Sequence, residues 1–154
     1  MIQRIQTFYL ALAAAFSGFL LKGQIFTLVG MDAESYEFNI KGLFLKGDIT
    51  TTVIEGSLPL FILTILVIIL FFLAIFLFKR RKLQIRITIL ATLLSFGSLL
   101  LIIYYLIIAA KTLEAEFIFG IRMVFPAASA IFGYLAFRGI LKDELLIKSY
   151  DRIR

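Results

Sequence analysis

The residues best suited to chemistry in this chain are positively charged. One is Arg122, which lies in an apolar stretch and is followed four residues later by Pro126. A proline removes the helical hydrogen bond to the carbonyl four residues before it, so Pro126 predicts a bend and a polar notch beside Arg122. An arginine there would bind a lipid phosphate or a partner carboxylate. The alternative is an interfacial arginine that reaches the outer headgroups, paired with Glu114 or Glu116.

The densest positive block lies between two stretches that have few polar residues. Its members are Lys79, Arg80, Arg81, Lys82 and Arg86. A nucleic-acid surface would combine basic residues with stacking aromatics or a groove-reading element, and this block contains neither. We therefore expect it to hold a hairpin in the cytoplasm and to contact anionic headgroups, with no nucleic acid bound.

Several kinds of catalytic site are excluded by composition. The chain has no Cys, His or Trp, which excludes thiol nucleophiles, imidazole proton shuttles and Cys/His zinc sites. It has no glycine-rich phosphate loop, no metal-ligand cluster and no nucleophile paired with a base. No Asp, Glu or Lys lies inside an apolar span, which disfavours a proton-driven transporter. We predict neither an enzyme nor a cofactor.

Hydropathy indicates a membrane protein. Of the 154 residues, 62% are hydrophobic, and the 17% that are charged gather in short segments. We predict an all-α membrane protein with a bundle of four transmembrane helices, at about 5–21, 58–78, 87–110 and 117–137. A signal peptide is the competing interpretation of the first stretch, because "AAAFSG" offers small residues for cleavage; the apolar residues that continue through Leu21 favour a retained span.

The distribution of Lys and Arg predicts orientation. Eleven lie in the N-terminus, the hairpin 79–86 and the tail 138–154, and five lie in the other two loops. The positive-inside rule therefore places both termini in the cytoplasm, and we expect a multi-pass protein of the bacterial inner membrane. The pattern of the tail predicts an amphipathic helix. This helix either lies along the headgroups or docks on a partner, and the alternative is a solvated end of the fourth helix.

The first extracytoplasmic loop, 22–57, has a strand pattern. In "SYEFNIKGLFL", Tyr36, Phe38 and Ile40 alternate with polar residues, as in a half-buried strand. "QIFTLVG" and "DITTTVI" on either side are rich in β-branched residues. We predict a small antiparallel sheet of about three strands at the ends of the helices.

Small residues recur four positions apart, a spacing that places each pair on one helix face and permits close packing. The pairs are Ala14 and Gly18, Ala91 and Ser95, and Ser129 and Gly133. The second span has almost no such residues. We therefore expect the first, third and fourth spans to form the tight core and the second to be exposed to lipid or a partner.

Three blocks together resemble the signatures of domain-of-unknown-function family 4293, small four-span proteins of Bacteroidota: "MIQRIQTFYL", "KRRKLQIRITI" and "LKDELLIKSYDRIR". The resemblance covers essentially the whole chain and implies a fold and a location but no activity, so no site residues carry over. The plan of four helices and a β-rich first loop is also similar to that of claudins in architecture only, because the claudin Trp and Cys pair are absent.

These observations predict a non-catalytic polytopic membrane protein, an accessory, assembly or stabilising subunit of a larger envelope complex. Its partners would be membrane lipids and a membrane protein or further copies of itself. The alternative is a binder or transporter of lipids or small apolar molecules that uses the interior of the helix bundle.

Overall fold

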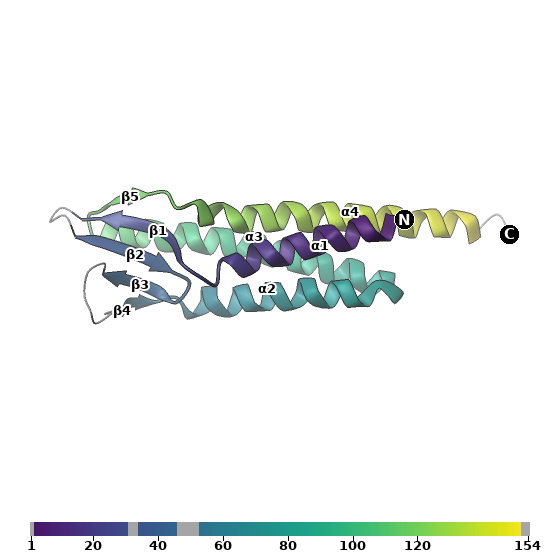
Figure 1. Ribbon diagram of the computed structural model, residues 1–154, viewed down its shortest axis with the longest axis horizontal. Helices are drawn as coiled ribbons and strands as arrows, with labels where there is room; N and C mark the ends of the chain where they lie inside the picture. The colour runs from purple at the N-terminus through teal and green to yellow at the C-terminus, as the bar shows by residue number, and fades with distance from the viewer. Residues whose placement is uncertain (1, 31–33, 46–52, 152–154) are drawn as a thin grey trace.

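Four long helices lie side by side with a β-sheet at one end in the computed structural model, which describes residues 2–30, 34–45 and 53–151 (Figure 1). The helices are α1 (Ile2–Phe19), α2 (Leu58–Phe76), α3 (Arg81–Thr112) and α4 (Phe125–Asp151). α1 and α3 each pack against both α2 and α4, so the four helices form a closed ring. We call the end that carries the strands the sheet end, and the end with the α2–α3 connection the turn end.

Three helical segments are long and apolar enough to cross a membrane: Leu58–Lys79, Arg81–Thr112 and Ile121–Leu146. These lengths are consistent with a membrane protein. The apolar part of α1, Ile5–Phe19, is shorter. The predicted first span continues to residue 21, but the helix ends at Phe19 because the chain turns there toward the first strand.

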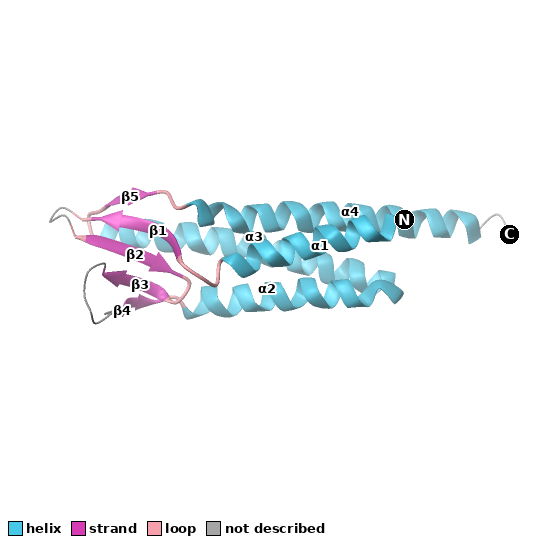
Figure 2. Ribbon diagram, in the orientation of Figure 1, coloured by secondary structure: helices cyan, strands magenta, loops and turns pink. Residues whose placement is uncertain are grey.

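The sheet has five antiparallel strands rather than the three predicted, in the order β4-β3-β2-β1-β5 (Figure 2). They are β1 (Gln24–Val29), β2 (Ser35–Asn39), β3 (Gly42–Leu45), β4 (Val53–Gly56) and β5 (Glu116–Ile118). The predicted middle strand is a hairpin, because the chain reverses at Ile40 and Lys41 and pairs Asn39 with Gly42. Of the predicted third strand, positions 48–52 lie outside the described residues.

The fourth helix begins at Phe125, eight positions later than predicted. α3 ends in a Schellman motif, in which Glu114 has φ 46° and the Ala115 N–H donates to the carbonyl of Ala110. The next residues satisfy their backbone groups by pairing with β1 as strand β5. A 3₁₀ turn, η2 (Ile121–Val124), then leads into α4, which continues without a break through the predicted tail to Asp151.

Two buried clusters form the core. At the sheet end, Phe26 and Phe38 stack with ring centroids 4.5 Å apart, and Phe38 contacts Tyr105 of α3 at 5.6 Å. An irregularity in β1 between Gln24 and Phe26 allows both Ile25 and Phe26 to be buried. The second cluster lies within the helices and includes Leu10, Phe71 and Ala91.

The expectation that the second span lies outside the tight core is wrong, although α2 does expose Leu, Ile and Phe side chains on its other face, as expected. One face of α2 is buried, and it comprises Leu60, Thr64, Val67, Phe71 and Ala74. Phe71 is fully buried and reaches Gly133 of α4 on the opposite side of the ring. Phe71 of α2 thus fills space left by the small residue Gly133 on α4, whereas Thr64 and Ala74 are small residues on the buried face of α2 itself.

Candidate functional site

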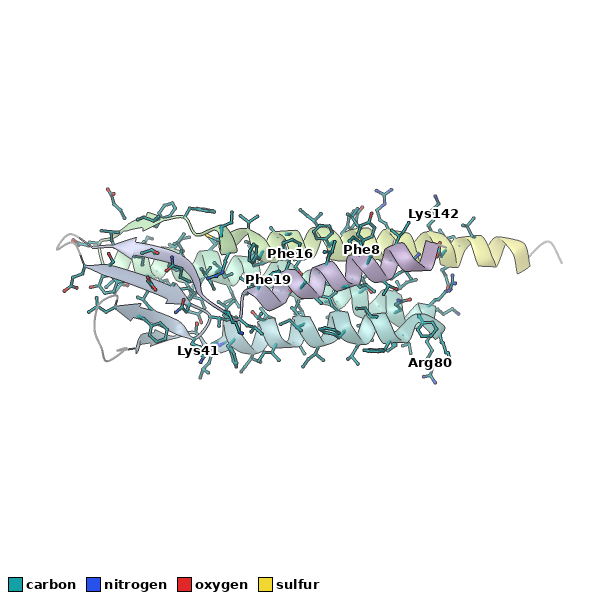
Figure 3. The ribbon with its side chains drawn as sticks, in the orientation of Figure 1. Phe8, Phe16, Phe19, Lys41, Arg80 and Lys142 are labelled. Atoms are coloured by element: carbon teal, nitrogen blue, oxygen red, sulfur yellow. The ribbon has the colours of Figure 1, made fainter. Side chains whose placement is uncertain are left out.

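The basic block lies on the α2–α3 connection and on the first turns of α3, instead of in one loop. The connection between the helices is only the 3₁₀ turn η1 (Leu77–Lys79) and Arg80, because α3 already begins at Arg81. The predicted hairpin 79–86 is therefore shorter, and Lys82 and Arg86 are exposed on the first turns of α3. Figure 3 shows Arg80 and Lys142 of α4 projecting on opposite sides of this end. Positive charge thus lies on at least two sides of the turn end.

Arg122 lies at the sheet end, in η2, and joins two loops. Its Nη1 donates a hydrogen bond of 3.3 Å to the carbonyl of Gln24. The guanidinium lies against Gly23, where φ is +89° and a Cβ atom would overlap it. Its partner in the described structure is this carbonyl, not the carboxylate of Glu114 or Glu116. Arg122 therefore fastens the α1–β1 connection to η2.

Pro126 does not bend a helix. It is the second residue of α4, in the first turn, where its missing N–H is harmless. The Arg122 carbonyl accepts a hydrogen bond from the N–H of Phe125, so the predicted polar notch is absent there. The bend was predicted because the helix was expected to begin before Arg122.

Ser129 joins α4 to α1. Its hydroxyl donates to the carbonyl of Ala13 at 2.9 Å and lies 2.8 Å from the hydroxyl of Ser17. All three residues are buried, and Ala14 is buried beside them. The small residue at position 129 thus allows a polar contact between helices as well as close packing.

The remaining small residues differ in how closely they are packed. A Cβ at Gly133 would lie 2.5 Å from Oγ1 of Thr92 and 3.0 Å from Cζ of Phe71, so glycine is required. Ala91 and Ser95 are buried on α3, and the Ser95 hydroxyl has no hydrogen-bond partner. Gly18 is different: a Cβ there would meet nothing within 4 Å. The prediction of close helix approach at Gly18 is wrong, because that part of α1 faces no neighbouring backbone.

Two buried polar contacts at the turn end were not predicted. Gln6 of α1 donates from Nε2 to Oδ2 of Asp143 on α4 at 2.6 Å, and Gln84 of α3 donates to the carbonyl of Ala74 on α2 at 2.9 Å. Asp143 was assigned to the tail, because its charged neighbours concealed that it is only 8% exposed. The sequence did contain a signal for these contacts, which was a glutamine near the start of two apolar stretches, Gln6 in the first and Gln84 just before the third.

Two hollows adjoin the turn-end half of the helices. A polar one of about 20 Å³, the size for a single water, is lined by residues including Gln6, Arg81 and Gln84. A larger groove of about 260 Å³ lies on the outer wall between α3 and α4, lined by Ile89, Thr92, Leu93, Tyr134 and Phe137. We call this the α3–α4 groove.

The described residues do not assemble catalytic or metal-binding chemistry. No three His, Cys, Asp or Glu side chains come together within the parts of the chain that the structure describes. The buried polar groups with recorded partners bond to neighbouring helices, loops or their own backbone. The arrangement is suited to packing, to contacts with lipid and to contacts with protein.

Comparison with known proteins identifies a family but not a function. The search of curated proteins finds no match. A family model described as "Domain of unknown function (DUF4293)" matches residues 2–153. The resemblance carried by the terminal and central blocks of sequence is thereby confirmed. The chain belongs to this DUF4293 family.

Proposed function

We propose that this protein is a non-catalytic accessory, assembly or stabilising subunit of a larger envelope complex in a bacterial inner membrane. In this proposal all four helices cross the bilayer, the sheet end is extracytoplasmic and both termini are cytoplasmic. The basic residues at the turn end support this orientation through the positive-inside rule. The shorter α1 would cross with local thinning of the bilayer, which has a small energetic cost.

The observation that carries the proposal is an exposed apolar surface at the sheet end, which we call the β5–η2 patch. Its residues are Phe117, Ile118, Phe119, Ile121 and Val124. Ile121 is 77% exposed and Phe119 is 61% exposed. β5 is also an edge strand, so one side of its backbone is unpaired in the sheet. Ile121 and Val124 also belong to the segment Ile121–Leu146 that can cross a membrane, so lipid would cover them. Phe117, Ile118 and Phe119, on and beside the open edge of β5, are the part of the patch that best fits a protein partner. Exposed apolar patches and open strand edges are typical of interaction surfaces.

The interior of the bundle favours this function over the alternative of a carrier that binds lipids or small apolar molecules inside. Leu10, Phe71, Ala91 and Ala136 meet between the helices, and each is fully buried. A carrier would need a cavity of several hundred cubic ångströms, about 300 Å³ or more. These four side chains and their neighbours in the same cluster pack against one another between the helices, which favours a filled interior.

Site-specific crosslinking tests the proposal. A photo-reactive phenylalanine analogue would replace Phe119 in the patch or, as a control, Phe76, which is 72% exposed at the turn end. After irradiation in native membranes and purification in mild detergent, we expect a discrete crosslinked protein from position 119 only. A strictly monomeric protein with no enriched partner from either position would count heavily against a subunit role.

A further inference from the structure

The α3–α4 groove has positive charge at one end. Arg86 precedes Ile89 by three positions and Leu93 by seven, so helical spacing places it on the groove face of α3. Arg138 follows Tyr134 by four positions and shares its face of α4. Both arginines are exposed, and neither pairs with a carboxylate among the described residues.

The two arginines lie at similar heights in the bundle. α3 and α4 run in opposite directions, and Gly133 lies against Thr92. Each residue of a helix rises about 1.5 Å along its axis. Arg86 is therefore about 9 Å from Thr92 toward the turn end, and Arg138 is about 7.5 Å from Gly133 in the same direction. They therefore flank the same end of the groove, where two guanidinium groups could bind one phosphate.

This height corresponds to the headgroup region of a bilayer. Along α3, the rise from Arg86 to Tyr104 is about 27 Å, close to the hydrocarbon thickness of about 30 Å. Tyr104 is exposed at the other boundary, as expected for an interfacial aromatic residue. The groove thus begins at the turn-end headgroups and extends into the hydrocarbon.

Tyr134 adds a polar group inside the groove wall. Its side chain is 51% exposed, and its rise from Arg138 is about 6 Å, toward the hydrocarbon. Tyrosine in a membrane span is usually found at an interface, with its hydroxyl bonded to a polar group. A phospholipid would supply an ester oxygen below its phosphate, at the depth of this hydroxyl.

From these observations we propose that the α3–α4 groove binds one anionic phospholipid of the turn-end leaflet. Arg86 and Arg138 bind its phosphate, Tyr134 donates a hydrogen bond to an ester carbonyl, and an acyl chain lies along Ile89, Leu93 and Phe137. The site rests on the membrane insertion proposed above but requires no protein partner. It is also distinct from the bundle interior, because it opens on the outer wall.

Tryptophan fluorescence can test the site, because the chain has no native Trp. The variant Phe96→Trp places a reporter next to the groove, one turn beyond Leu93, and Phe72→Trp places one on the exposed surface of α2. The full-length protein is reconstituted in phosphatidylcholine vesicles that contain a minor fraction of phosphatidylglycerol brominated on its acyl chains. We expect selective quenching of the reporter at position 96, saturating at low phosphatidylglycerol content.

Charge variants then distinguish lipid binding in the groove from general electrostatic attraction of anionic lipid to the turn end. Combining Arg86→Gln with Arg138→Gln should lower the apparent affinity at position 96 about tenfold, as expected when charge-assisted hydrogen bonds are lost. The control pair Lys79→Gln and Arg80→Gln removes the same charge from the turn end outside the groove and should change the affinity little. Equal losses in both pairs, or equal quenching at positions 72 and 96, would overturn the proposal.

Native mass spectrometry of the unmodified protein provides a second measurement that does not depend on variants. We expect one phosphatidylglycerol to be retained in preference to phosphatidylcholine. Equal retention of the two lipids would contradict the site even if every variant failed to fold. Because no partner protein is present in either experiment, these outcomes are independent of the crosslinking result at Phe119.

Discussion

Gly133 determines how closely α4 approaches the helices that it faces. The space that a side chain would occupy is already filled by Phe71 of α2 and Thr92 of α3. Phe71 is an aromatic ring at the centre of the bundle and is fully buried, so it has little room to move aside. A single hydrogen at position 133 therefore allows three helices to meet.

Replacing Gly133 with Ala should destabilise the protein by about 1–3 kcal/mol, the usual cost of overpacking a core. The measurement is the free energy of unfolding in a detergent titration. Gly18→Ala is the matched control, because the new Cβ has open space, and it should be neutral or slightly stabilising. Equal destabilisation by the two changes would show that Gly133 has no special packing role.

The buried contact between Gln6 and Asp143 ties the first turns of α1 to the last part of α4. Asp143→Ala should cost about 1–3 kcal/mol, because the Gln6 amide loses its partner while remaining buried. The double variant with Gln6→Ala should cost less than the sum of the two single changes, by about 1 kcal/mol. Strict additivity in the same titration would mean that the pair contributes no coupling.

At the scale of elements, β5 connects the two halves of the chain. It pairs with β1 through Thr27 and Ile118, Leu28 and Phe117, and Val29 and Glu116. Gly120, just after β5, lies so close to the carbonyl of Ile25 that a Cβ atom would overlap it. The second loop is thus held against the first by strand pairing and by one close backbone approach.

The substitution Gly120→Ala should release β5 from β1, because the new methyl group displaces the Ile25 carbonyl. Hydrogen exchange measured by mass spectrometry should show faster exchange in residues 116–124 and little change in α2. Gly56→Ala in β4 is the control, because nothing lies within 4 Å of the added Cβ. Unchanged exchange in β5 would show that the approach at Gly120 is dispensable.

The sequence alone was sufficient to predict those elements whose hydrophobic pattern lies within one continuous segment. Long apolar runs predicted α2 and α3, and alternation around Phe38 predicted part of the sheet. The start of α4 could not be predicted in this way, because residues 117–124 are mostly apolar in either state. Residues 116–118 become strand only by pairing with β1, far away in sequence, and the 3₁₀ turn η2 follows them. Likewise, Gly18 and Gly133 each follow another small residue by four positions, but only the fold determines which of the two glycines packs against a facing helix.

At the scale of the whole molecule, charge is strongly asymmetric along the bundle. The basic residues of the turn end lie on the α2–α3 connection and the exposed part of α4, whereas the connections that form the sheet contain few Lys or Arg residues. Lys41 marks the sheet end and Arg80 and Lys142 the turn end (Figure 3). This asymmetry favours one orientation in a bilayer.

Replacing Lys79, Arg80, Arg81 and Lys82 with Gln should weaken or invert the proposed orientation, because the positive charges that would retain the α2–α3 connection in the cytoplasm are lost. A reporter fused to the C-terminus, active on only one side of the membrane, measures the result. The control replaces the four lysines of the sheet-end loops, Lys22, Lys41, Lys46 and Lys111, with Gln. It removes the same charge without touching Arg122 and should leave the orientation unchanged. An unchanged orientation would show that the remaining basic residues suffice and that this block has another role.

Because β5 comes from the second loop, the order of synthesis exposes a surface that the finished protein conceals. β1 to β4 and α2 are translated before residues 116–118 exist, so until α3 has been completed and β5 follows it, β1 is the open edge of a four-stranded sheet. That edge is a template for a chaperone or a quality-control protease during biogenesis. Pairing with β5 closes it, and the completed sheet thereby marks a chain that has been synthesised and folded through α3.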